Sequence, residues 1–157
     1  MFPLVLQNKY INILILSTCW SVLPISPILT PAITPTFAHE VEVSGNVAAT
    51  FHLEPNHNPK AGETAQVWFA LTQKGGEIIP FSNCQCQLLV YREPRTNSVP
   101  PILTPTLQGI AAEKYQGIPG ANVIFPEIGR YQLELTGSPK NGANFNPFQF
   151  RYSVTVQ

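Results

Sequence analysis

The stretch that decides the fold is FQFRYSVTV at residues 148–156, in which apolar and polar side chains alternate without a break. A period of two is the pattern of a β-strand with one buried face, because successive side chains point to opposite sides. The inward row would be Phe148, Phe150, Tyr152, Val154 and Val156. These large side chains should line a hydrophobic core.

The same alternation recurs upstream, and helical spacing of apolar residues is nearly absent. Turn signals rich in Gly, Pro and Asn separate the alternating segments. The further inward rows are Val47, Ala49, Phe51 and Leu53; Ala65, Val67, Phe69 and Leu71; and Tyr131, Leu133 and Leu135. We therefore predict an all-β fold, an immunoglobulin-like two-sheet antiparallel sandwich of about seven strands.

Some of the chain departs from this pattern. Residues 92–109 are rich in proline and predict a long crossover loop with little pairing. A short helical turn is expected at residues 111–115, and the Gly-Ile-Pro-Gly sequence at 117–120 indicates a turn. Trp68 falls on the outward face of its strand, where it would cover an edge of the sandwich or form a contact patch.

The amino-terminal part has the order of a secretory leader. Lys9 is its only charge, an apolar run follows at residues 10–23, and the small residue Ala38 stands at a suitable cleavage position. We predict a cleaved signal peptide over residues 1–38 with a proline-rich final region. Two alternatives remain open, an uncleaved anchor and a lipoprotein attached through Cys19.

Cleavage after Ala38 would leave a single domain of residues 39–157, exported to the periplasm or secreted, with no transmembrane span. Loss of Lys9 from nine basic residues leaves eight against nine glutamates, so no broad basic patch is available for nucleic acid. The chain contains no aspartate, which excludes an EF-hand loop and any catalytic triad that uses aspartate.

The three histidines of the chain, His39, His52 and His57, are the main candidates for metal ligands. Cleavage would give His39 a free α-amino group beside its imidazole, a chelating pair that suits copper and also zinc. His52 should point outward from the strand at residues 47–53. A short loop can fold His57 back toward it, and Glu40 or Glu54 could complete the set. The alternative is that three surface histidines lie near one another by chance.

Cys84 and Cys86 share the inward face of a strand, and three interpretations of them remain open. They can be thiolate ligands for copper(I) or zinc, or a redox pair. They can be buried core residues, since cysteine behaves as a small apolar side chain. A disulfide is disfavoured in a regular strand, because Cα atoms two residues apart are separated by ~6.6 Å, and it would need a bulge or turn.

The segment Phe125-Pro126-Glu127-Ile128-Gly129-Arg130-Tyr131 is similar to the tyrosine corner of immunoglobulin-like sandwiches, in which the Tyr131 hydroxyl would bond upstream backbone. With the turn at residues 59–63, the strand at 69–71 and the Gly75-Gly76 hairpin, the chain resembles the YtkA-like and CopC-like exported β-sandwiches over residues 48–157. The resemblance to the CopC-like proteins implies a copper(II) site at His39. Those sites use a further histidine with an aspartate, which this chain lacks.

We therefore expect a small exported protein that binds copper, or alternatively zinc, for buffering or delivery. The candidate ligands are His39, His52, His57, Cys84 and Cys86. The alternative is a metal-free immunoglobulin-like module that binds a protein of the cell envelope. An enzyme is not expected, because no nucleophile motif, phosphate loop or cofactor fingerprint is present, and a copper oxidase beginning at His39 would have little room for a substrate platform.

Overall fold

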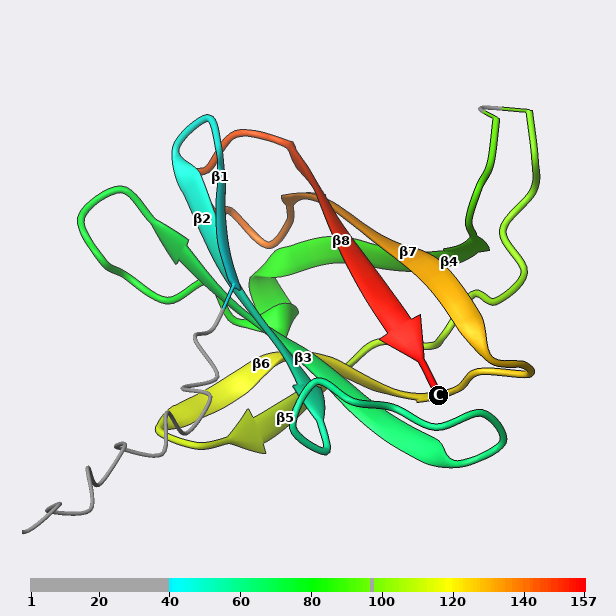
Figure 1. Cartoon of the computed structure of the whole chain (residues 1–157). Helices are drawn as coiled ribbons and strands as arrows, with labels where there is room; N and C mark the ends of the chain where they lie inside the picture. Colours follow the sequence, from blue (N-terminus) through cyan, green and yellow to red (C-terminus); the bar gives the residue numbers. More distant parts are fainter. Residues whose placement is uncertain (1–39, 97) are drawn as a thin grey trace, which may run out of the picture. The chain divides into compact units, whose positions relative to one another are not determined.

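The computed structural model describes residues 40–96 and 98–157, and the proposed leader, with His39 and Cys19, lies outside them. Eight strands are connected almost entirely by loops and turns (Figure 1). They are β1 (Glu40–Ser44), β2 (Val47–Glu54), β3 (Thr64–Gln73), β4 (Cys84–Arg92), β5 (Gln108–Ala112), β6 (Tyr115–Ile124), β7 (Gly129–Pro139) and β8 (Phe148–Val156).

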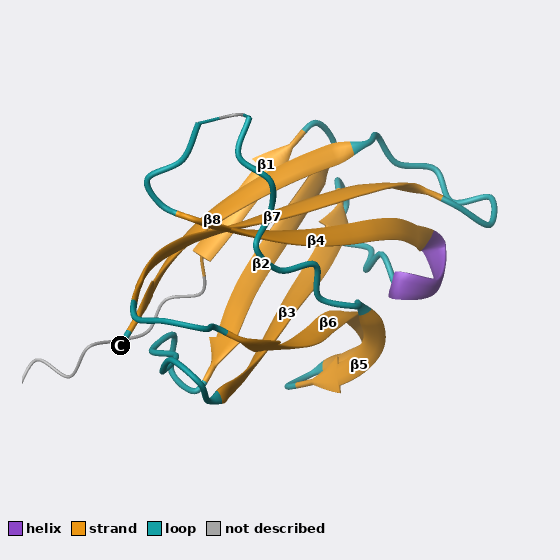
Figure 2. Ribbon diagram, turned by 90° about the vertical axis from the view of Figure 1, so that its right-hand side faces the viewer, coloured by secondary structure: helices purple, strands orange, loops and turns teal. Residues whose placement is uncertain are grey.

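The strands form two antiparallel sheets that pack as a sandwich (Figure 2). The five-stranded sheet has the order β1-β2-β3-β6-β5, and the three-stranded sheet has the order β4-β7-β8. The predicted all-β, two-sheet antiparallel fold is confirmed, with eight strands rather than about seven. The only helix among the described residues is the short 3-10 turn η1 (Phe81–Asn83), so none is long and apolar enough to span a membrane.

The core lies between the sheets and consists of the inward rows that the alternation predicts. In β8 every second residue is buried, from Phe148 to Val156. The ring of Phe51 in β2 stacks on that of Tyr152 in β8 at a centroid distance of 4.4 Å, which joins the two layers. Aromatic pairs of this kind add to the free energy gained by burying their area.

The predicted tyrosine corner is present at the start of β7. The buried hydroxyl of Tyr131 donates a hydrogen bond of 2.7 Å to the carbonyl oxygen of Glu127. The predicted long loop is also present, because residues 93–107 connect β4 to β5. It pairs with β4 through an isolated bridge between Val90 and Leu103.

The helical turn expected at residues 111–115 and the turn expected at 117–120 are both wrong. This part of the chain is a β-hairpin of β5 and β6, which pair antiparallel from Gln108 opposite Gly120 to Ala112 opposite Tyr115. The sequence suggested a turn because glycine and proline are common turn residues, and Pro119 has no N–H group to donate to a neighbouring strand. The pairing of β6 with β3 ends at Gly120, so at Pro119 the strand has only β5 beside it, a condition under which sheets tolerate proline.

The hairpin of β5 and β6 helps to form a second apolar cluster on the outward side of the five-stranded sheet. Trp68, Ala70 and Ile118 are fully buried there. The partly buried residues packed against them are Ile78, Ile110, Ala112 and Tyr115. Trp68 is therefore itself buried, on the central strand of the five-stranded sheet, which is neither of the two roles expected for it.

Candidate functional site

The structure brings His52 and His57 together beside Glu54. The Nε2 atom of His57 lies 3.1 Å from the Nδ1 atom of His52, and the Nε2 atom of His52 lies 2.9 Å from the Oε1 atom of Glu54. The sequence allows the loop to fold His57 back toward His52, and the structure has the two rings in this arrangement.

The approach of the two histidines follows from the chain turning immediately after β2. The backbone N–H group of His57 donates a hydrogen bond of 2.8 Å to the carbonyl oxygen of Leu53. Asn56 and His57 both have positive φ angles, 53° and 55°. Asparagine and histidine are among the residues most often found in this left-handed conformation. The tight turn returns the His57 side chain to the strand that it follows.

Aromatic packing holds both imidazole rings. The ring of His52 stacks on Trp68, its partner in the pairing of β2 with β3, at a centroid distance of 4.8 Å and an interplanar angle of 21°. The ring of His57 meets the edge of Phe51 at 5.5 Å. Only 14% of the His52 side chain is exposed. The two rings are therefore held by the sheet before any ligand binds.

The hydrogen-bond chain assigns a tautomer to His52. An ionised carboxylate can only accept, so the Nε2 atom of His52 carries the proton that faces Glu54. In a neutral ring the Nδ1 atom then presents a lone pair toward His57. This is the arrangement in which a carboxylate orients a histidine for metal binding.

Three side chains that together could enclose a metal ion are not found within residues 40–96 and 98–157. The third histidine named by the sequence, His39, lies outside the described residues. It immediately precedes Glu40, which begins β1 and pairs with Phe51, the neighbour of His52. Partial burial, with the nearby charge of Glu42, raises the pKa of the Glu40 carboxyl.

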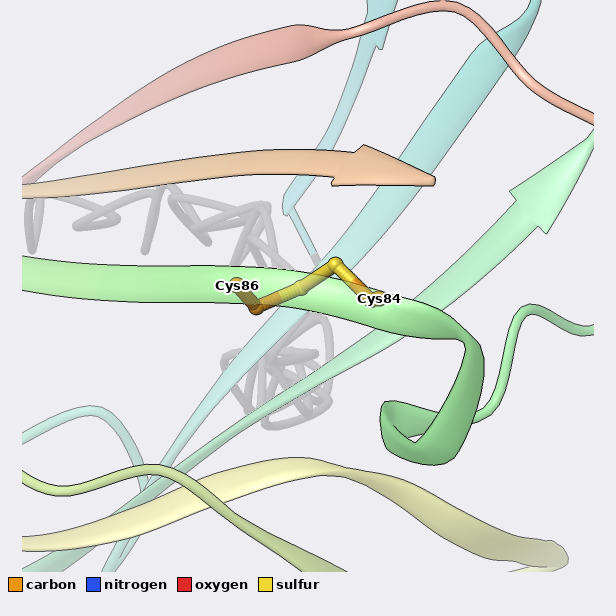
Figure 3. Close-up of a disulfide and its surroundings, with 2 residues drawn as sticks. All are labelled: Cys84 and Cys86. Carbon is orange, nitrogen blue, oxygen red and sulfur yellow. A yellow bond between two sulfur atoms is a disulfide. The ribbon is translucent and has the colours of Figure 1, made fainter. Parts of the chain in front are cut away.

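Cys84 and Cys86 form a disulfide that lies along β4 (Figure 3). The sequence disfavoured this bond, and that expectation is wrong. Their Cα atoms are 5.2 Å apart, closer than in a regular strand. The expected bulge is not present at this point, because the pairing of β4 with β7 continues in unbroken register from Cys84 opposite Pro139 to Cys86 opposite Gly137. Cys84 is buried in the core and Cys86 is partly buried, in agreement with the predicted inward phase.

The disulfide changes what these two residues can do. Thiolate sulfur is the ligand that binds copper(I) or zinc, and neither sulfur is a thiolate while the bond is intact. The cysteines are also on the three-stranded sheet, whereas His52 belongs to the five-stranded sheet. Gly137 makes room for the bond, because a Cβ atom there would lie 2.8 Å from the Sγ atom of Cys84.

Sequence reasoning missed a second polar site, a pocket of about 610 Å³ on the outward side of the three-stranded sheet. Its lining residues are Glu93, Pro94, Arg95, Arg130, Gln132 and Arg151. The alternation in β7 and β8 could have predicted that the side chains of Arg130, Gln132 and Arg151 point away from the core. The approach of Arg95 could not, since it depends on the path of the loop after β4.

No family model, curated protein or solved structure matches the chain.

Proposed function

We propose that the protein binds a transition-metal ion, copper or alternatively zinc, through His52 and His57 together with His39 at a processed amino terminus. The observation that carries this proposal is the 3.1 Å separation between the Nδ1 atom of His52 and the Nε2 atom of His57. The proposed role is buffering or delivery of the metal in the periplasm or outside the cell, without catalysis.

The separation of the two nitrogen atoms suits a shared metal ion. With metal–nitrogen bonds of ~2.0–2.1 Å, nitrogen atoms 3.1 Å apart subtend an angle of roughly 100° at the metal. This value lies between the angles of square-planar and tetrahedral coordination, the geometries usual for copper(II) and zinc respectively. To bind in this way, the Nε2 atom of His57 must carry a lone pair, with its proton moved to Nδ1 or lost.

Glu54 and His39 would complete the site in different ways. Glu54 would stay hydrogen-bonded to the Nε2 atom of His52 and fix the orientation of that ring. His39 would contribute its α-amino and imidazole nitrogens, as the resemblance to the CopC-like proteins implies. In the sequence His39 precedes Glu40, which pairs with Phe51, the neighbour of His52.

The test is a titration of the purified exported protein, after its amino-terminal residue has been determined, with copper(II), copper(I) and zinc in separate competitions against a chelator. We expect one metal ion per chain. His52→Gln and His57→Gln should each weaken binding at least ~100-fold, and Glu54→Gln should weaken it by ~10- to 100-fold. Adding one residue before His39 should remove the contribution of the α-amino group.

A matched control is Glu63→Gln, which removes another exposed carboxylate close to the same loop. The Oε1 atom of Glu63 lies 3.9 Å from the Nζ atom of Lys60, and Glu63 is not part of the histidine cluster. Its metal affinity should equal that of the wild type. Binding no tighter than micromolar for all three ions, or equal binding by His57→Gln and the wild type, would contradict the proposal.

One observation favours the second candidate, a metal-free module that binds an envelope protein. The strand β1 is at an edge of the five-stranded sheet, and its side chains Val41 and Val43 are 58% and 72% exposed. An edge strand with exposed β-branched residues can pair with an extended segment of a partner. Retention of a partner by His57→Gln and its loss in Val43→Lys would favour this candidate.

A further inference from the structure

All four arginines of the chain belong to one region of the molecule, although 59 positions separate the first from the last. Arg92 ends β4, Arg95 follows it in the loop, Arg130 is the second residue of β7 and Arg151 lies in β8. These are the three strands of the smaller sheet. Three of the four arginines line the pocket of about 610 Å³, and no lysine lines it.

The floor and wall of this pocket come from different parts of the chain. The floor is the outward face of β7 and β8, where Gln132 pairs with Ser153 and Glu134 pairs with Arg151. The wall is the start of the loop after β4. It is fixed to the sheet by a backbone hydrogen bond of 2.9 Å from the N–H group of Glu93 to the carbonyl oxygen of Arg130.

Arg95 is the least exposed of the three arginines that line the pocket. Its guanidinium carbon lies 3.7 Å above the centre of the Tyr91 ring, and its Nε and Nη2 atoms donate to the Oε1 atom of Gln132 at 3.1 and 2.7 Å. Its Nη2 atom also lies 3.2 Å from the Oε2 atom of Glu134. Only 14% of the Arg95 side chain is exposed. These contacts fix the plane of the guanidinium group.

A buried carboxylate connects two of the arginines. The Oε2 atom of Glu134 accepts hydrogen bonds from Arg95 and, at 2.9 Å, from the Nε atom of Arg151. Burial by itself would raise the pKa of the Glu134 carboxyl. Hydrogen bonds from Arg151 and Gln149 and the charges of Arg151 and Arg95 outweigh burial, and the net pKa lies below its usual value. Glu134 is therefore ionised at neutral pH and holds both guanidinium groups in place.

The arginines retain hydrogen-bonding capacity after these contacts. A guanidinium group has five N–H donors. Arg151 is bonded to Glu134 through Nε, and Arg130 is bonded to Glu93 through Nη2 at 2.8 Å. The three guanidinium groups are paired with two carboxylates, Glu93 and Glu134. A third carboxylate, Glu42, accepts a hydrogen bond of 3.1 Å from the backbone N–H group of Arg151.

Stability alone does not account for the cluster. The side chains of Arg130 and Arg151 are 68% and 54% exposed, and ion pairs at such positions contribute little to the free energy of folding. Arginine differs from lysine in presenting paired N–H groups that match the two oxygens of a carboxylate or phosphate. A pocket lined by arginine without lysine therefore favours recognition of a planar or tetrahedral oxyanion.

We propose that this pocket binds a small molecule through a carboxylate or phosphate group, which Arg130 and Arg151 hold while Arg95 and Glu134 keep the site in shape. The pocket volume of about 610 Å³ is in the range of small-molecule sites. The site is on the three-stranded sheet, apart from the histidines of the five-stranded sheet, and does not depend on metal binding.

The test uses the metal-free, full purified protein at low and constant ionic strength. Inorganic phosphate and citrate are titrated separately, and binding is read by calorimetry and by amide chemical-shift changes. Stronger binding of phosphate would identify a phosphate ligand, and stronger binding of citrate would identify a carboxylate ligand. We expect Arg130→Gln to lower the affinity for the preferred probe at least ~10-fold. Arg130→Lys should lower it less, because lysine keeps the positive charge but lacks the paired N–H groups of arginine.

Arg92→Gln is the matched control, since it removes the same charge from the same cluster. Arg92 forms an ion pair with Glu127 and does not line the pocket, so the affinity should change less than twofold. His57→Gln should bind both probes as the wild type does, which separates this site from the proposed metal site. If neither phosphate nor citrate binds at ~10 mM, or if Arg92→Gln and Arg130→Gln weaken binding equally, the proposal is overturned.

Discussion

The outward faces of the two sheets have opposite chemistry. On the five-stranded sheet the outward side chains include the buried Trp68 and Ile118, with His52 stacked on the indole ring. On the three-stranded sheet most of them are polar, Leu89 and Tyr91 being the exceptions, and the buried Glu134 lies between Arg95 and Arg151. Both faces come from the same alternation of strands. The alternation therefore predicts which side chains point away from the core. Whether those side chains are exposed or buried depends on the segments that pack over them.

The difference also separates two kinds of binding chemistry. Imidazole rings packed on an aromatic surface stay in one orientation and present lone pairs, which suits a metal ion. Guanidinium groups arranged around a carboxylate present N–H donors, which suits an anion. The described chain keeps these two sets of side chains on different sheets, so variants of one set should leave the other unaffected.

The largest expected effect is the loss of the covered outward face in Trp68→Ala. Trp68 is 1% exposed, and truncation of a buried tryptophan costs about 3–5 kcal/mol of unfolding free energy. The matched change on the opposite sheet is Gln87→Ala, an exposed outward position, which should stay within ~0.5 kcal/mol. Urea denaturation measures both. A cost below ~1 kcal/mol for Trp68→Ala would show that this face is not a second core.

A smaller effect is expected from Glu134→Gln on the polar face. The variant leaves Arg95 and Arg151 without the carboxylate between them, and loss of a buried charged partner costs about 1–3 kcal/mol at pH 7. The folded-state pKa of Glu134 is lowered, so its stabilising contribution is present above the usual pKa of 4.5 and is lost as pH falls through the folded-state value.

The pH profile distinguishes this electrostatic effect from a packing defect. Urea denaturation at pH 7 and near pH 3 should show the difference between wild type and Glu134→Gln shrinking toward acid. The exposed pair of Arg92 and Glu127 provides the comparison, and Glu127→Gln should cost less than ~1 kcal/mol. A difference between wild type and Glu134→Gln that stays constant over this pH range would indicate that the variant acts through packing.

The sequence predicts the parts of the molecule that depend on short-range pattern. The inward rows of β2, β3, β7 and β8 follow from a period of two, and the tyrosine corner follows from the residues that precede Tyr131. The approach of His57 to His52 was also predictable, because five positions of chain that include a tight turn limit where the second ring can lie.

The remaining features depend on long-range packing or on local geometry that differs from the ideal. Trp68 is covered partly by the hairpin of β5 and β6, and Pro119 made that hairpin look like a turn. Arg95 reaches Glu134 across 39 positions of sequence, so only the pairing of strands and the path of the loop bring them together. The disulfide was disfavoured because the spacing of a regular strand was assumed for Cys84 and Cys86.

The last expected effect belongs to that disulfide, on the inward face of the three-stranded sheet. Its loop contains only three residues, and the chain-entropy model gives roughly 1.6 kcal/mol of stabilisation for a loop of this size. Without the bond, β4 still pairs with β7 from Cys84 opposite Pro139 to Arg92 opposite Tyr131. Thermal unfolding with and without a reductant should therefore show a modest loss, and Cys84→Ser with Cys86→Ser should still fold. If reduction unfolds the domain, the short bond contributes far more than loop closure predicts, and the three-stranded sheet depends on it.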